Sequence, residues 1–154
     1  SGFIMEHKAQ RLYRDARILS IYEGTTQLQV VAAIRYVTNG TYLDILREFE
    51  QEAVIDELKP LQERIIEMTN KFEAATNLVK EAGNQELLDI LARSLYEMAA
   101  VNVMANLLLM DASRAPELFA KSAKVYVNLV ESEVEKHFKF INSFKAEDLE
   151  AYKK

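Results

Sequence analysis

The apolar residues of this chain recur in alternating steps of four and three, and this spacing constrains the fold more than any other feature. The first stretch of this kind consists of Leu61, Ile65, Met68, Phe72, Ala75 and Val79. Similar stretches follow over residues 88–109 and 119–144. Because this is the spacing of one helix face packed in a bundle, the sequence predicts long α-helices that share one core.

Short breaks separate the predicted helices. Asn39-Gly40 suits the end of one helix, and residues 82–85 suit the end of another. Pro60 and Pro116 suit first helical turns, where the missing N–H is not needed. Short connections make neighbouring helices antiparallel. The predicted fold is therefore all-α, an up-down helical bundle resembling a four-helix bundle, with three long helices and shorter N-terminal helices.

The predicted fold has four further details. A helix restarts at Thr41 and continues through residues 42–54. The last long helix is expected to bury one face, made of Phe119, Ala123, Tyr126, Val130, Val134, His137, Ile141 and Phe144. A second apolar stripe, and with it a second packing surface, is expected at Leu87, Ile90, Val101 and Leu108. The polar tail from Lys145 is expected to fray or to form a short terminal helix.

Composition excludes several classes of protein. The chain has 154 residues, a formal net charge of −5 and no Cys, which excludes disulfides and thiolate metal sites. Its basic residues are mixed with acidic ones, so we expect no nucleic-acid surface. Its longest apolar run is far shorter than the roughly 20 residues of a membrane-spanning helix. We also expect no signal peptide.

A metal-binding bundle was weighed against a purely structural one. Carboxylate-bridged metal bundles use Glu-x-x-His pairs. Here Glu133 and Glu135 precede His137 by four and two residues, so the pairing is absent and no metal site is predicted. Asn102 on an apolar seam is interpreted as a polar residue that sets the register of the helices.

The residues around Glu23 do not follow the packing pattern. Glu23 lies between the apolar pair Ile21-Tyr22 and Gly24, with Thr25 and Gln27 close behind. A carboxylate beside apolar groups can lose water, which raises its pKa and makes it a usable base. The same residue could instead be an acid favoured by the dipole at a helix start. Composition alone favours the second interpretation.

The segment that contains Glu23 resembles the C-terminal signature of acyl-CoA dehydrogenases. That pattern runs Arg-Asp-Ala, a short apolar stretch, and then Tyr-Glu-Gly-Thr-x-Gln-x-Gln. In this chain it reads Arg14, Asp15 and Ala16, followed by Tyr22, Glu23, Gly24, Thr25, Gln27 and Gln29. The resemblance covers residues 1–37, and Val30 departs from it because the family usually has Arg there.

The resemblance implies specific roles. Glu23 would be the base that removes the α-proton of an acyl-CoA thioester, and its backbone N–H would hold the thioester carbonyl. Gly24 would let the substrate approach closely. Thr25 and Gln27 match positions that contact FAD. A role in fatty-acid metabolism, with an electron-transfer flavoprotein as partner, is implied as well, together with a homo-oligomer.

Members of this family are far longer than this chain, so we interpret the chain as a C-terminal piece. Residues 1–40 would end the catalytic domain, and residues 41–154 would form an additional helical bundle domain. The piece alone is expected neither to hold FAD nor to oxidise acyl-CoA. We expect it in the bacterial cytoplasm or, in a eukaryote, in the mitochondrial matrix. The alternative is a stand-alone helical module for oligomerisation or interaction, without catalytic activity.

Overall fold

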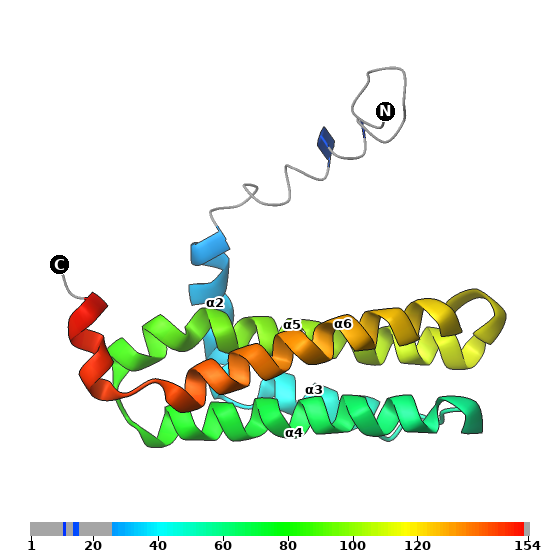
Figure 1. The fold of residues 1–154 in the computed structure, drawn as a ribbon, viewed down its shortest axis with the longest axis horizontal. Coiled ribbons are helices and arrows are strands. Elements are labelled where there is room, and N and C mark those ends of the chain that lie inside the picture. The colour runs from blue at the N-terminus through cyan, green and yellow to red at the C-terminus, as the bar shows by residue number, and fades with distance from the viewer. Residues whose placement is uncertain (1–10, 12–13, 16–25, 153–154) are drawn as a thin grey trace.

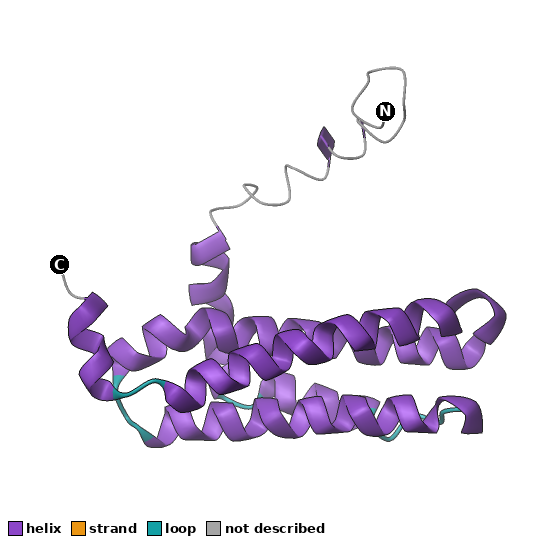
Figure 2. Cartoon of the chain, in the orientation of Figure 1, coloured by secondary structure: helices purple, strands orange, loops and turns teal. Residues whose placement is uncertain are grey.

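The computed structural model describes residues 11, 14–15 and 26–152. Its helices are α2 (Thr26–Thr38), α3 (Thr41–Phe49), α4 (Lys59–Glu81), α5 (Gln85–Arg114) and α6 (Pro116–Ser143), with 3-10 helices η2 (Asp56–Leu58) and η3 (Ala146–Tyr152). No strand occurs within these ranges (Figure 2). The predicted all-α bundle is confirmed.

Three long antiparallel helices, α4, α5 and α6, lie side by side and form the body of the molecule (Figure 1). The shorter helices α2 and α3 complete the bundle by packing against α5. Helix α2 runs across the long axis of the bundle rather than along it (Figure 1). Within the described ranges, every other α-helix and η3 contact α5, so α5 is the central element of the fold.

Two glycines make the sharp turns between helices. Gly40 between α2 and α3 has φ 91°, and Gly83 between α4 and α5 has φ 59°. Both values fall in the left-handed region that glycine adopts without steric cost. Asn84 caps α5, because its Oδ1 accepts from the Leu87 N–H at 3.2 Å. At the other turn, Asn39 Oδ1 accepts from the Thr41 N–H, the first of α3, at 3.0 Å. The predicted breaks at these two positions are confirmed.

Helix α3 is shorter than predicted, because it ends at Phe49 rather than continuing through residue 54. The segment after it is held by a residue distant in the sequence. Ser113 Oγ on α5 accepts from the Ile55 N–H at 3.0 Å and donates to the Ala53 carbonyl at 3.5 Å. These tertiary hydrogen bonds satisfy the Ile55 N–H and the Ala53 carbonyl without a helix. Helix propensity does not predict them, because Ser113 is distant in the sequence.

The core consists of the buried faces of α4, α5 and α6, to which the shorter elements add Val37, Leu46 and Leu58. Its largest fully buried side chains include Phe72, Ile65, Met68, Leu91, Leu95, Met98 and Ile141. On α6 the buried face is Ala123, Val127, Val130, Val134 and Ile141. The predicted face therefore missed Val127 and wrongly included Phe119, whose side chain is 37% exposed. The face of α6 that packs against the core is therefore rotated slightly about the helix axis from the predicted face.

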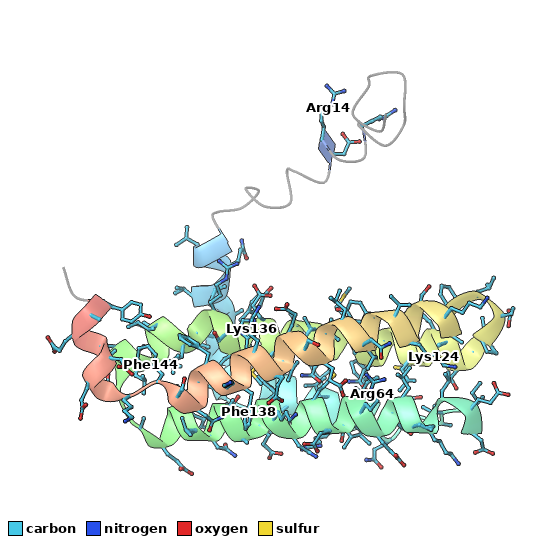
Figure 3. The ribbon with its side chains drawn as sticks, viewed as in Figure 1. Arg14, Arg64, Lys124, Lys136, Phe138 and Phe144 are labelled. Carbon is cyan, nitrogen blue, oxygen red and sulfur yellow. The ribbon has the colours of Figure 1, made fainter. Side chains whose placement is uncertain are left out.

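The chain's C-terminal end folds back as η3, which matches the second of the two predicted possibilities for the tail. Leu149 is buried, and η3 contacts α5. The Phe144 ring lies between Phe140 and Tyr152, at centroid distances of 5.6 and 5.7 Å (labelled in Figure 3). None of the described helices is both long enough and apolar enough to cross a membrane.

Candidate functional site

The residues assigned to the site lie at the edge of the described structure. Glu23, Gly24 and Thr25 lie outside the described residues, and Gln27 lies in α2 without a described side chain. Of the same motif, Arg14 and Asp15 are described as helical and exposed, and Arg11 Nε lies 3.6 Å from Asp15 Oδ2. The roles assigned to Glu23, Gly24, Thr25 and Gln27 therefore stay predictions.

Helix α2 carries the end of the motif and is anchored to the bundle by one face. Val30 and Val37 are each 1% exposed, and Ile34 packs against the core. The helix ends where Thr38 Oγ1 donates to the Ile34 carbonyl at 3.1 Å. Val30 stands where the resembling family usually has Arg, and its burial explains the change, because an apolar side chain suits a site without water.

The opposite face of α2 is apolar yet open. Leu28 is 60% exposed and Val31 is 57% exposed. Leu28 and Val31 follow the predicted catalytic residue by five and eight positions in the sequence. A large apolar pair at such a position is typical of a contact surface, so this face of α2 is suited to packing against a further part of a longer protein.

A cationic group lies further along α2. Arg35 Nη2 donates to the Tyr36 hydroxyl at 2.6 Å, and its guanidinium carbon lies 4.6 Å from the Tyr36 ring centroid. Tyr36 in turn meets Tyr42 of α3 edge to face at 6.4 Å. The hydrogen bond and the ring contact with Tyr36 both restrain the exposed Arg35 guanidinium. Its remaining N–H groups could bind an anionic partner.

Two salt bridges tie α4 to α6 along the bundle. Arg64 Nη2 donates to Glu131 Oε2 at 2.7 Å and also to Asn128 Oδ1 at 2.9 Å (Arg64 is labelled in Figure 3). Lys71 Nζ donates to Glu135 Oε2 at 2.6 Å. The Arg64 guanidinium, through its hydrogen bond, lowers the pKa of Glu131. These partly exposed pairs align the helices more than they stabilise them.

The buried polar residue Asn102 lies at the centre of α5. Its Nδ2 donates to the Met98 carbonyl at 2.8 Å and, across the bundle, to the Met68 carbonyl of α4 at 3.5 Å. Its Oδ1 is buried and has no hydrogen-bond partner among the described residues, and the same holds for Thr76 Oγ1. A buried amide that reaches the neighbouring helix favours one alignment of α4 and α5, in agreement with its interpretation as a register residue.

The titratable groups of the bundle form no metal site within the described ranges. No group of three or more His, Asp or Glu side chains lies there in an arrangement that could hold an ion. Burial, and then the charge of Lys136, lowers the pKa of His137, against the opposing charges of Glu97 and Glu133. A half-buried, neutral imidazole is a packing residue here.

The described surface has shallow hollows rather than a deep pocket. One of about 380 Å³ lies at the α4–α5 turn, beside Thr38, Lys80 and Gly83. Another, of about 440 Å³, lies on α5 and α6 around Leu108, Val125 and Leu129. This second surface was not predicted from the sequence. Its signal in the sequence is the pair Val125 and Leu129, which are four residues apart and lie outside the buried face of α6.

The expected second stripe is wrong in its residues. Leu87 is buried in the core, and Ile90, Val101 and Leu108 pack partly against it. The large apolar side chains that remain exposed on α5 and α6 are Met104, Leu107, Leu118, Phe119, Val125, Leu129 and Phe140. Of the four expected residues, Ile90 and Leu108 also line surface hollows, so part of their apolar area stays at the surface.

Three long antiparallel helices preceded by two shorter ones define an all-α helical bundle. Two family models agree with this class of protein. Residues 38–149 match the model described as "Acyl-CoA dehydrogenase C terminal", and residues 1–37 match "Acyl-CoA dehydrogenase, C-terminal domain". The chain therefore belongs to the acyl-CoA dehydrogenase family. Its predicted division into domains after residue 40 stays a prediction.

A solved structure resembles the bundle over almost its full length. It is the crystal structure of an acyl-CoA dehydrogenase family protein from Porphyromonas gingivalis, 40% identical, with a TM-score of 0.70. The match covers 74% of this chain and 98% of that chain.

Two curated relatives match a much shorter stretch. A subunit of a caffeyl-CoA reductase-Etf complex, CarC from Acetobacterium woodii, is 57% identical over 28 residues. A 3-(aryl)acrylate reductase from Clostridium sporogenes is 54% identical over 28 residues. The stretch covers 18% of this chain and 7% of each relative.

Proposed function

We propose that this chain is the C-terminal region of a longer, FAD-dependent acyl-CoA dehydrogenase and that Glu23 is the base of the reaction. The observation that carries the proposal is the ordered match from Arg14 to Gln29 in a chain that belongs to this family. The reaction is the α,β-dehydrogenation of an acyl-CoA thioester. Residues 41–154 would be an additional domain that serves assembly rather than chemistry.

The open face of α2 supports a longer protein. Leu28 and Val31 are more than half exposed, although the opposite face of the same helix is fully packed. Covering two such side chains contributes about 1.5–3 kcal/mol each. A preceding catalytic domain is the natural cover, because this helix follows the predicted active-site residues directly in the sequence.

The chemistry assigned to this chain is the removal of one proton. The Glu23 carboxylate would take the α-proton of the thioester, which requires a raised pKa and therefore a site without water. The negative charge that develops on the thioester carbonyl would be held by the Glu23 N–H.

The flavin site would be formed mainly by parts of the longer protein outside this chain. The hollows described in this chain are shallow, and a shallow site leaves a large ligand mostly in water. We therefore assign FAD, which would supply the hydride acceptor, to the longer protein, with Thr25 and Gln27 as a minor part of its contacts.

The test is Glu23→Gln in the longer protein that contains this chain. We expect dehydrogenation to fall by several orders of magnitude while FAD stays bound, because the amide keeps the shape of the side chain and removes the base. The matched control is Glu117→Gln in the exposed first turn of α6, which should leave the rate unchanged. Unchanged activity of the Glu23 variant would place the base elsewhere.

A second candidate is the reverse reaction, reduction of an α,β-unsaturated acyl group. It is favoured by the names of the two curated relatives, both of which are reductases. Glu23 would then deliver the proton to the α-carbon instead of removing it. Comparing the two directions on the longer protein decides the matter: a saturated acyl-CoA with an artificial electron acceptor, against an arylacrylyl-CoA with a reduced donor.

The proposed partners follow from the same family. One relative's name places it in a complex with Etf, and we propose an electron-transfer flavoprotein as the redox partner here as well. We also propose a homo-oligomer, located in the bacterial cytoplasm or the mitochondrial matrix. The competing possibility is a stand-alone helical module for oligomerisation or interaction, and a longer protein without dehydrogenase or reductase activity would favour it.

A further inference from the structure

Asn39 is the one asparagine of this chain that precedes a glycine, since the other seven precede Lys, Leu, Gln, Val or Ser. Asparagine is a thermally labile residue. Before a glycine it is more so, because the next backbone nitrogen can reach the side-chain amide carbon without a Cβ in its way. Asn39 is also exposed to water, in the turn between α2 and α3. Sequence and exposure therefore single out this amide for a covalent change.

The Asn39 amide is held at its oxygen by two donors. The Thr41 N–H donates to Asn39 Oδ1 at 3.0 Å, and the Thr41 hydroxyl donates to the same oxygen at 2.8 Å. When a nitrogen attacks an amide carbon, negative charge develops on the amide oxygen, and donors already aimed at that oxygen stabilise the charge. Thr41 therefore activates the Asn39 side chain toward attack.

The Gly40 nitrogen, which would attack, is only weakly engaged. Its N–H donates to the Val37 carbonyl at 3.3 Å, a longer bond than the 3.0 Å from the Asn39 N–H to the Arg35 carbonyl. A Cβ built at Gly40 would meet no atom within 4 Å. Releasing one long hydrogen bond frees the nitrogen, and the turn leaves room for the movement that brings it to the Asn39 amide carbon.

We propose that Asn39 is a site of spontaneous deamidation and backbone isomerisation. The Gly40 nitrogen forms a bond to Asn39 Cγ, the bond from Cγ to Nδ2 breaks, and ammonia leaves with the proton of the Gly40 nitrogen. Water then opens the cyclic imide. Opening at Cγ yields an aspartate, and opening at the main-chain carbonyl carbon yields an isoaspartate, in which the chain runs through the former side chain.

The two products would affect the turn differently. Isoaspartate adds a carbon to the backbone between two anchored positions, because Val37 is 1% exposed and Leu46 is fully buried. It also moves the oxygen that Thr41 holds. Aspartate keeps that oxygen in place and brings a negative charge to the start of α3, where a helix dipole favours it. Isoaspartate should therefore loosen α2 from the bundle, whereas aspartate should not.

The turn is also the boundary between the two matched family regions, residues 1–37 and 38–149. Isoaspartate would accumulate with the age of the molecule and weaken the connection between the predicted active-site segment and the bundle. The inference does not depend on the role of Glu23, because every atom in the reaction belongs to Asn39, Gly40 or water.

The test is incubation of the 154-residue chain in neutral buffer at physiological temperature, followed by trypsin digestion and mass spectrometry. Trypsin releases the peptide 36–47, in which Asn39 is the only asparagine. The internal control is the peptide 72–80, whose Asn77 is also exposed but lies within α4 before Leu78. When half of Asn39 has reacted, we expect no more than a trace of reacted Asn77. A digest of fresh protein corrects for conversion during digestion.

A variant of Thr41 tests the activation. Thr41→Val removes the hydroxyl donor and keeps the N–H, and it should slow the conversion of Asn39 by about two- to tenfold, the worth of one hydrogen bond. Thr38→Val is the matched control, because the Thr38 hydroxyl donates to the Ile34 carbonyl instead; it should leave the rate unchanged. Circular dichroism verifies that both variants keep their helices.

The effect on the fold is measured against Asn39→Asp. Anion exchange separates the reacted wild-type chain by its additional negative charge. This fraction has the same charge as Asn39→Asp and differs from it only through isoaspartate, so we expect it to have the lower Tm.

Three results would overturn the proposal: Asn39 that stays intact over weeks or reacts no faster than Asn77, an unchanged rate in Thr41→Val, or a reacted fraction whose Tm equals that of Asn39→Asp.

Discussion

At the scale of single residues, burial separates side chains of the same type. Phe72 is fully buried in α4, whereas Phe119 at the start of α6 is 37% exposed. Both were predicted to face the core, since both follow the four-and-three spacing. Spacing predicts which residues share a helix face, but not how far the neighbouring helices cover that face near its end.

We expect Phe72→Ala to lower the free energy of unfolding by about 3–5 kcal/mol, because it removes a large apolar side chain and leaves a cavity. Phe119→Ala is the matched control and should cost about 1 kcal/mol or less. Urea unfolding of the 154-residue chain, followed by circular dichroism, measures both. Equal losses would contradict the burial assigned to these two rings.

His137 makes stability depend on pH. Burial and the charge of Lys136 lower its folded-state pKa below the usual 6.5, so the unfolded chain takes up the proton first as pH falls. The contribution of His137 is therefore complete above about pH 6.5 and is lost as pH falls from there through the lowered folded pKa. The pKa of Glu131, already below its usual 4.5, affects stability only at lower pH.

We expect His137→Asn to remove the part of the pH dependence that lies just below pH 6.5. Urea unfolding at a series of pH values, for the wild type and the variant, measures the difference. His7, which is present in both proteins, contributes equally and cancels. An unchanged slope in the variant would show that His137 has the same pKa in the folded and unfolded states.

At the scale of elements, turn residues decide where the helices end. Gly83 has φ 59°, and a Cβ built there would meet no atom within 4 Å. Gly83→Ala should therefore cost about 1–2 kcal/mol, through backbone strain rather than through a clash. Gly83→Asn should cost less, since Asn tolerates this conformation better. Thermal unfolding separates the variants, and equal stability of glycine and alanine would contradict this explanation.

Turns of this kind could be predicted from the sequence because Gly, Pro and Asn act through their own backbone. Asn39-Gly40, Gly83 and Pro116 were each placed correctly for that reason. The end of α3 could not be predicted, because Ser113 holds the segment after it from 58 residues away. The second apolar stripe was misplaced for a similar reason, since tertiary packing decides which apolar residues stay outside.

At the scale of the whole molecule, the proposed site would need parts of a longer protein besides this chain. The resemblance at Arg14 to Gln29 pointed to the correct family, because motif residues are recognisable without their surroundings. The site itself could not be derived, because a flavin pocket needs walls from several elements. The open side chains of Leu28 and Val31 mark one place where such a wall would join.

We therefore expect the purified 154-residue chain to retain no stoichiometric FAD. Visible absorbance after gel filtration in the presence of added FAD measures retention, with the longer protein as the positive control. The physical reason is that the described surface has only shallow hollows, and a shallow site leaves a large ligand mostly in water. A chain that stays yellow would show that it holds the cofactor by itself.

The central position of α5 has a consequence for biosynthesis. Its 30 residues contact α2, α3, α4 and α6, yet α6 leaves the ribosome last of these. Until the nascent chain reaches Ser143, one side of α5 faces water with its apolar residues uncovered. At synthesis rates of about 5–20 residues per second, this interval lasts on the order of seconds. During that time the half-built bundle is the form of the protein most open to chaperones and to aggregation.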